Sequence, residues 1–501
     1  MLLVSFLRKS DLPVSPETVH SKMSQVHAGA INTPCRVFPE LLFVQVFCFA
    51  ILHAIWMLPG TIGLRNTCLG IGALLSLYPL YQSRHLFLQK RAIPIWLIAT
   101  LFGWVTIHLL FLAQDPIAQL AEFTSIWKRS AIGVIFALGM GISIAHLRKL
   151  ANTSTQISRW MSACWILFYM GLLAPTLIYL IKVLLTLYGP HWGIVAPQAI
   201  QMYVGTNSIY VAKTAYVAFC LPVFAVALGS LLRNIESHRW VSWSNLAYLA
   251  TLPAVFAVFY AENIKNGVAY GLALVLVFLL LVVASLFKGR WVPKVLLSLI
   301  LLIASIFFLN SHLQQNDSWK TFGADAKVAL NTSQYQQWKF NGEKGYPNNA
   351  LGAPVSVSNY ERIAWAKEGI RLVIQNPLGY GLVERSFGRL GKIAWPDSKL
   401  HQSHSGWIDL TLGLGIPGFL LIFTTLLILL YQMIGLIKGD QKIQNLFPNL
   451  ARWTLLSLLF MWCTTEISQK IYIDELIFWL ALGSGICLES PHALDAGANN
   501  S

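Results

Sequence analysis

Long apolar segments alternate with short polar connections over most of the chain. Each apolar segment runs for roughly 18 to 30 residues, and a helix of that length crosses a hydrocarbon core of about 30 Å. The pattern predicts an all-α polytopic membrane protein with about twelve transmembrane helices. The predicted spans are centred in residues 40–59, 67–82, 93–113, 130–147, 160–186, 212–232, 243–261, 267–287, 293–310, 407–436, 450–468 and 472–488.

One long polar segment interrupts this pattern after the ninth predicted span. The segment 311–404 predicts a loop outside the membrane, and its first half, rich in Gln, Asn, Lys and Gly, predicts irregular cover. From Ser358, apolar residues at helical spacing predict an amphipathic helix on the membrane surface, with a cap formed by Ser358 and Glu361. Pro377 ends that helix, because proline cannot continue it.

Basic residues predict how the helices are oriented. Lys and Arg concentrate in every second connection, and connections of this kind face the cytoplasm. Both chain ends are therefore predicted inside the cell, and the long loop on the opposite side of the membrane. The predicted organisation is a cytoplasmic segment 1–36, nine spans within 37–310, the outer loop 311–404, three spans within 405–488, and a cytoplasmic tail 489–501.

Composition agrees with a membrane protein and excludes one class of partner. Hydrophobic residues make up 56% of the chain and charged residues 11%, and the mean hydropathy of +0.59 exceeds what a soluble domain needs. The formal net charge is +15. The cations flank the predicted spans instead of sharing a polar face with aromatic residues, so we expect contacts with membrane lipids and no nucleic-acid binding.

No metal site or cofactor is predicted. None of the seven cysteines lies in the outer loop, so neither a disulfide nor a cysteine-based metal motif is expected there. His401 and His404 are three residues apart, but no nearby carboxylate or cysteine completes a set of metal ligands. The chain has no phosphate-binding P-loop and no glycine-rich dinucleotide motif.

A histidine stands where the outer loop re-enters the membrane. At helical spacing, His404 shares one stripe with Gly415 and Gly418, and glycines on that stripe would let another helix approach and build a site. Asp409 falls off the stripe, so we do not assign it as the orienting partner of the histidine. The alternative is an interfacial histidine that is hydrogen-bonded for stability alone.

Arginines and lysines gather in the second half of the outer loop. Arg362 lies in the first turn of the predicted amphipathic helix, and Gly379 and Gly381 form a turn after it that can approach a ligand closely. The remaining cations give a positive surface that favours an anionic ligand such as phosphate. For these cations the alternative is contact with phospholipid headgroups. They are Arg371, Arg385, Arg389, Lys392 and Lys399.

Two of these segments together resemble the O-antigen ligase family. In the first, His404-Ser405 is followed after nine residues by Gly415-Ile416-Pro417-Gly418, which is similar to the family's histidine-to-glycine pattern. The second is the helix beginning at 358–365 with its exit at 376–381, which is similar to the family's arginine-bearing loop helix. The specific matches cover about 60 residues, and the topology covers most of the chain.

The resemblance implies a fold, a reaction and a set of residues. Members transfer a glycan from undecaprenyl diphosphate to an acceptor hydroxyl, with inversion and without a metal or nucleotide, at the periplasmic face of the bacterial inner membrane. It implies that His404 activates or orients the acceptor hydroxyl and that Arg362 binds the diphosphate leaving group. Lys265 stands where members usually carry a second arginine, a departure that keeps the charge but not the planar fork. Ser405, Gly379, Gly381, Arg385, Gly415 and Gly418 are the predicted site-lining residues.

Several functions remain open from the sequence. The leading prediction is ligation of O-antigen to lipid A-core. A protein O-oligosaccharyltransferase and an O-antigen polymerase share the same pattern and differ in the acceptor. A flippase or transporter for lipid-linked glycans would also have about twelve spans, but it predicts broken helices in two matching halves, and the sequence shows no such halves.

Overall fold

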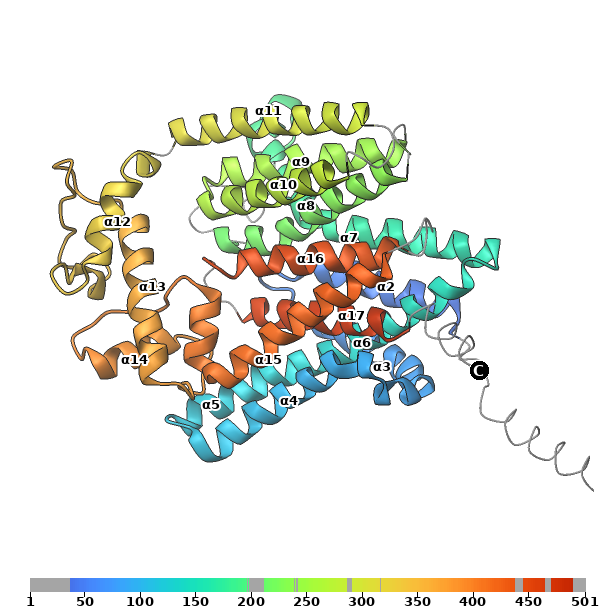
Figure 1. Ribbon diagram of the computed structural model, residues 1–501, viewed down its shortest axis with the longest axis horizontal. Coiled ribbons are helices and arrows are strands. Elements are labelled where there is room, and N and C mark those ends of the chain that lie inside the picture. The colour runs from blue at the N-terminus through green and yellow to red at the C-terminus, as the bar shows by residue number, and fades with distance from the viewer. Residues whose placement is uncertain are drawn as a thin grey trace, which may run out of the picture. The chain divides into compact units, whose positions relative to one another are not determined.

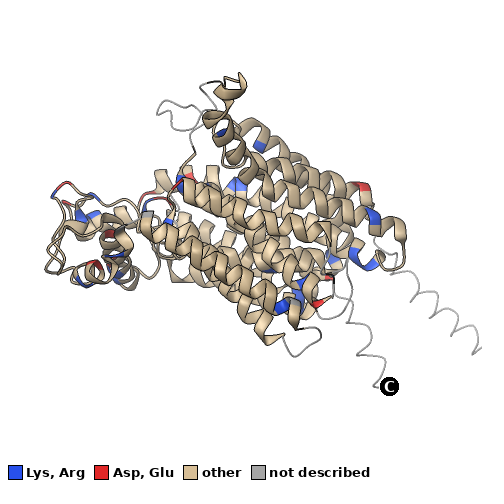
Figure 2. Ribbon diagram, turned by 90° about the horizontal axis from the view of Figure 1, so that it is seen from above, with Lys and Arg blue, Asp and Glu red and all other residues tan. Residues whose placement is uncertain are grey.

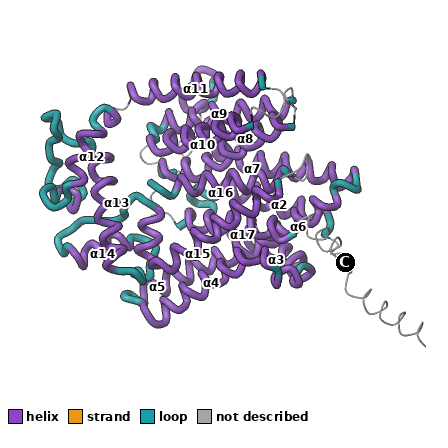
Figure 3. Tube along the Cα trace, viewed as in Figure 1, coloured by secondary structure: helices purple, strands orange, loops and turns teal. Residues whose placement is uncertain are grey.

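The computed structural model describes residues 37–195, 197, 211–237, 239, 242–285, 291–315, 317–437, 445–464 and 470–489. These residues form helices and loops, without a β-strand among them, and one isolated bridge pairs Asn348 with Pro354 (Figure 3). The predicted cytoplasmic segment 1–36 lies outside the described residues, as does the predicted tail except for Glu489.

Every predicted span overlaps a helix of the structure. The helices are α2 (Pro39–Ile55), α3 (Ile62–Gln82), α4 (Ile93–Ile107), α6 (Lys128–Leu150), α7 (Thr155–Leu187), α8 (Lys213–Glu236), α9 (Trp243–Ala261), α10 (Lys265–Ala284), α11 (Val292–Gln315), α15 (Gly406–Leu436), α16 (Leu446–Met461) and α17 (Ile471–Leu488). The short α5 (Pro116–Glu122) runs through a π-helical turn, Phe123–Trp127, into α6.

Nine helices in the described part of the chain are long and apolar enough to cross a membrane. The helices α2 and α16 are apolar but shorter than these nine, and α3 is not among them. The all-helical membrane fold is therefore confirmed, and the count of twelve spans stays a prediction. Charged residues lie mainly near the helix ends and in the region between α11 and α15 (Figure 2).

Close packing joins the apolar helices. The helices α7, α9, α10 and α16 pack around α8, and the most apolar window of α8 is completely buried. The helices α6 and α17 cross at Gly141 and Gly485, where a Cβ atom on Gly485 would come within 2.4 Å of the Leu138 carbonyl oxygen. Glycine lets the two backbones approach this closely.

The outer loop folds around a hydrophobic core of its own. It contains α12 (Phe322–Leu330), α13 (Val357–Gln375) and α14 (Ser386–Ala394), at one end of the long helices (Figure 1). Buried side chains from all three helices, from the segments that connect them and from the start of α15 make this core, among them Val328, Trp338, Tyr360, Trp365, Phe387 and Leu412. The prediction of irregular cover was wrong for residues 322–330, which form α12, whereas residues 331–356 are mostly turns and irregular segments that contribute Trp338 to this core.

The predicted amphipathic helix is present as α13, and it ends at Gln375, just before Asn376 and Pro377. Its cap differs from the prediction. Ser356 is the N-cap residue, and Ser358 lies inside the helix, where its hydroxyl accepts a hydrogen bond from Lys265. An N-cap residue stands just before the first helical residue, and Ser358 is already helical, so the predicted Ser358–Glu361 cap was wrong.

The helix α15 is interrupted at Gly415, whose φ of 71° and ψ of 176° are not helical. The segment after α13 fills the interruption: the N–H of Tyr380 donates to the Leu412 carbonyl and the N–H of Ile416 donates to the Pro377 carbonyl, both at 2.8 Å. The Trp104 indole donates to the Leu414 carbonyl at 2.7 Å. These bonds satisfy backbone groups that the break would otherwise leave unpaired.

Candidate functional site

His404 lies in the last residues of the outer loop, just before α15. Its backbone has a φ of 56°, which is the left-handed region, and the helix begins two residues later at Gly406 with Ser405 as the N-cap. The predicted helical stripe from His404 to Gly418 is therefore wrong, because the histidine is outside the helix and Gly415 breaks it. Instead, the imidazole stacks on the indole of Trp365, with ring centroids 5.2 Å apart.

A short hydrogen-bond network fixes the backbone on both sides of His404. The buried carboxylate of Asp409 accepts the N–H of Ser403 at 2.9 Å, and the Ser405 N–H donates to the Ser403 hydroxyl at 3.2 Å. A residue other than glycine held in a left-handed conformation costs on the order of 1–3 kcal/mol and persists only where its surroundings impose it. Asp409, which sequence spacing set aside, thus helps to impose the His404 conformation through the neighbouring backbone.

The histidine opens onto a cavity with cationic walls. This cavity has a volume of about 450 Å³ and is lined by Asn341, Trp365, Arg385, Lys399, His401, Gln402 and His404. A second cavity, of about 460 Å³, shares Arg385, Lys399 and His401 with the first. The structure therefore brings two predicted site residues, His404 and Arg385, to one hollow.

The two residues predicted to bind diphosphate also meet. The ammonium group of Lys265, at the start of α10, donates to the hydroxyl of Ser358 at 2.9 Å and also to the hydroxyl of Ser318. Arg362 is one turn after Ser358 on α13, and its charge acts on Lys265. Trp365 follows on the same side of the helix, so α13 carries Arg362, the hydroxyl that contacts Lys265 and the aromatic partner of His404 within about two turns.

A buried carboxylate stands beside the cation pair. Burial alone would raise the pKa of Asp325, but hydrogen bonds from Asn349, Thr321 and Asn359 and from the Ser356 N–H hold the pKa of this carboxyl below its ordinary value. A negative charge is therefore kept next to Lys265, on which it acts. The arrangement limits the repulsion between Lys265 and Arg362.

Two of the predicted site-lining glycines lie directly against backbone. A Cβ atom on Gly415 would lie 2.4 Å from the Leu378 carbonyl oxygen, and one on Gly379 would lie 2.3 Å from the Gly415 nitrogen. Gly381 lies against the side chains of His108 and Gln119, and Gly418 against the side chain of Leu414 in its own helix. Gly379 and Gly415 allow the segment after α13 to dock on the broken helix, and the four glycines are absent from the walls of the two cationic cavities as described.

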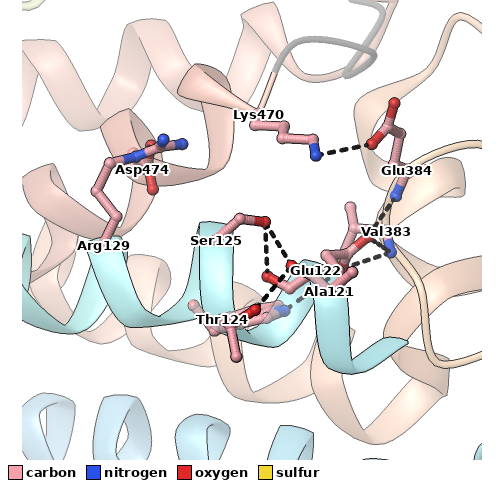
Figure 4. Close-up of polar contacts among 10 residues, drawn as sticks. Ala121, Glu122, Thr124, Ser125, Arg129, Val383, Glu384, Lys470 and Asp474 are labelled. Atoms are coloured by element: carbon pink, nitrogen blue, oxygen red, sulfur yellow. Dashed lines mark hydrogen bonds and ion pairs between the residues drawn. The ribbon is translucent and has the colours of Figure 1, made fainter. Parts of the chain in front are cut away.

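Glu122, at the end of α5, is a residue that the sequence analysis missed. Its buried carboxylate accepts the backbone N–H groups of Val383, at 3.0 and 3.1 Å, and Glu384, at 3.1 Å (Figure 4). Glu384 also pairs with Lys470 at 3.4 Å. Glu122 therefore fixes the backbone directly before Arg385, and an acidic residue within an apolar segment was the sequence signal for it.

Metal ligands do not cluster in the described part of the chain. No group of three or more His, Cys, Asp or Glu side chains there is placed to hold a metal ion.

One family model matches part of the chain. The family model described as O-antigen ligase matches residues 265–423. The match begins at Lys265 and includes Arg362, Arg385 and His404. No curated protein and no solved structure matches the chain significantly.

Proposed function

We propose that this chain is a membrane glycosyltransferase that transfers a glycan from undecaprenyl diphosphate to a hydroxyl group of lipid A-core. The match of the O-antigen ligase family model to residues 265–423 supports this proposal. In this proposal the reaction is inverting, needs no metal ion, and takes place at the periplasmic face of the bacterial inner membrane. The O-antigen polymerases and the protein O-oligosaccharyltransferases are the alternatives, and they differ from this proposal in the acceptor.

The observation that carries the proposal is that His404 contacts two segments that bear cations. On one side, its aromatic partner Trp365 lies on the helix that bears Arg362 and contacts Lys265. On the other side, His404 shares a cavity wall with Arg385 and Lys399. A base flanked by cations suits a reaction in which a hydroxyl loses a proton and a diphosphate leaves.

The proposed step balances without a cofactor. As the acceptor oxygen attacks the anomeric carbon, His404 takes the hydroxyl proton, which an imidazole can do at neutral pH. The bond between the anomeric carbon and the diphosphate oxygen breaks on the opposite face of the sugar, and the diphosphate leaves with the electron pair. Attack from the face opposite the leaving group inverts the anomeric centre.

Arg362 and Lys265 are proposed to bind the leaving diphosphate. A guanidinium group presents a planar fork of N–H donors that matches phosphate oxygens, and an ammonium group adds a point charge. Fixed cations stabilise the charge that develops on the leaving group, as a metal ion does in other transferases.

A third cavity, which is apolar, supports the proposal that the donor is linked to a lipid. It has a volume of about 510 Å³ and lies between α4 and α15, beside the interruption at Gly415, with Trp104, Ile107, Pro417, Leu420 and Leu421 in its walls. Its lining suits isoprenoid carbons.

The test is replacement of His404 with a control at His191, an exposed histidine that lines neither cationic cavity. We expect His404→Ala to abolish glycan attachment and to accumulate lipid-linked donor, whereas His191→Ala retains attachment. Membrane abundance of both variants is measured by immunoblot. Normal attachment by His404→Ala at normal abundance would disprove the catalytic assignment, and analysis of the molecule that carries the glycan distinguishes lipid A-core from protein.

A further inference from the structure

We propose that the second cationic cavity, between α14 and residues 399–401, binds a phosphate group of the acceptor glycan. This inference rests on the proposed function, since it names a binding site for the molecule that receives the sugar. It assigns Arg385, Lys392 and Lys399 to the acceptor, separate from the donor cations Arg362 and Lys265.

The two cationic cavities share wall residues, and this connects the proposed phosphate site to His404. The second cavity shares Arg385, Lys399 and His401 with the cavity that contains His404. Each hollow has a volume of about 450 to 460 Å³, which falls within the range of about 300–1,000 Å³ found for small-molecule sites. An acceptor whose phosphate occupies the second cavity therefore extends directly toward the histidine.

The cations that line the second cavity favour an anionic ligand. Arg385, Arg389 and Lys392 recur at helical spacing at the start and along one face of α14, and Lys399 stands on the opposite wall. Among the described residues, no aspartate or glutamate lines either hollow. Arg389 is paired with Asp115 at 3.0 Å and lies over the Tyr380 ring, so the net positive charge comes from the other three cations.

Backbone contacts hold the two sides of the second cavity together. The N–H of Gly388 donates to the His401 carbonyl at 3.0 Å, and a Cβ atom on Gly388 would lie 2.3 Å from the Leu400 carbonyl oxygen. This contact holds α14 directly against residues 400–401. Arg385 has a left-handed φ of 60° and follows the backbone that Glu122 binds. A cation set held this way is preorganised for a ligand.

Phosphate could reach this cavity from two sources, a phosphorylated glycan or a phospholipid headgroup. We assign it to the glycan because the hollow continues to His404, where a headgroup has no role in the transfer. The two sources are separated by the composition of the bilayer in the test.

The experiment measures binding of mannose 6-phosphate to the full chain in phosphatidylcholine nanodiscs by saturation-transfer NMR, with unphosphorylated mannose as the reference. The test variant is the double substitution Arg385→Gln and Lys399→Gln. The matched control is Lys327→Gln, an exposed cation on α12 that lines neither cavity. Thermal unfolding verifies that each variant is folded.

We expect wild type and Lys327→Gln to bind the sugar phosphate in preference to mannose, and the double variant to bind it about tenfold more weakly. Equal binding by the double variant and wild type would overturn the proposal. So would loss of binding in Arg362→Lys with retention in the double variant, which would place the ligand at the donor cations. Displacement of the sugar phosphate by phosphatidylglycerol in the nanodisc would assign the cavity to a headgroup instead.

The outcome is independent of the catalytic assignment. His404→Ala is expected to bind mannose 6-phosphate as wild type does, because the probe needs only the cations. If glycan transfer survives His404→Ala while the double variant loses binding, the proposed chemistry fails and the acceptor site stands.

Discussion

The imidazole of His404 lies nearly parallel to the indole of Trp365, with an interplanar angle of 10° and ring centroids 5.2 Å apart. The indole is itself fixed, since its N–H donates to the Trp338 carbonyl at 2.9 Å and its side chain is buried. The core of the outer loop thereby sets the plane of the histidine ring. Two segments that are about 40 residues apart in the chain make one functional unit.

Replacing Trp365 should therefore reduce catalysis more than binding. Aromatic stacking contributes about 0.5–1.5 kcal/mol, so we expect Trp365→Leu to lower the transfer rate by about three- to tenfold, with a smaller change in the donor KM. Trp365→Phe keeps an aromatic face and should restore part of the rate. Initial rates measured over a range of donor concentrations check this. A lower rate in both variants with equal loss of folded protein would indicate a structural role alone.

Asp409 should act on His404 through the backbone. Asp409→Ala removes the acceptor of the Ser403 N–H and leaves a buried donor without its partner, a cost of about 1–3 kcal/mol. We expect about a tenfold lower transfer rate at normal membrane abundance. Asp409→Asn retains an amide oxygen that can accept the same N–H, so it should keep more activity than the alanine variant. Equal rates for wild type and Asp409→Ala would contradict the assignment.

Glu122 should hold the segment that carries Arg385. In Glu122→Ala, the N–H groups of Val383 and Glu384 lose their acceptor. Hydrogen exchange at these two amides should accelerate by about tenfold or more, which corresponds to a local opening made easier by at least about 1.4 kcal/mol. Thr124→Ala is a nearby control, because its hydroxyl bonds only to carbonyl groups within its own helical turn in the contacts described. Unchanged exchange at both amides in Glu122→Ala would disprove the proposal that Glu122 holds this backbone.

Gly415 should tolerate no side chain. Its φ of 71° and ψ of 176° belong to a region that is essentially reserved for glycine, and a Cβ atom would collide with the Leu378 carbonyl. We expect Gly415→Ala to lower the thermal unfolding temperature in detergent and to reduce transfer, at a cost of about 1–3 kcal/mol or more. Gly435→Ala, in the same helix with open space around it, should be neutral or stabilising. Equal unfolding temperatures for the two variants would contradict this view of the break.

The sequence was sufficient to predict the long helices but not the short ones or the contacts between them. Each predicted apolar span overlaps a described helix, although the span predicted as 450–468 ends at Met461 as α16. Pro377 gave the end of α13, and both signals could be read because they are local to the chain. The short helices α12 and α14 carry too few periodic positions to be recognised. The left-handed backbone of His404 depends on Trp365, Ser403 and Asp409 together, and no single segment encodes that arrangement.

The same limit applies to the candidate site. The types and number of cations in the outer loop indicated an anionic ligand, and the structure gathers several of them around two hollows. Glu122 is more than 250 positions from the backbone that it binds, so its role follows only from tertiary packing. The pairing of Lys265 with Ser358 likewise joins α10 to the loop across many intervening residues.

The interruption at Gly415 separates two parts of α15 that have different surroundings. The part before Gly415 is bonded to the segment 377–381, and the part from Pro417 to Leu436 is long and apolar. A helix whose hydrophobic length differs from the local bilayer thickness adjusts by tilting or bending. We therefore expect a change of tilt in the apolar part to be absorbed at the break, so that membranes of different thickness leave the geometry around the histidine unchanged.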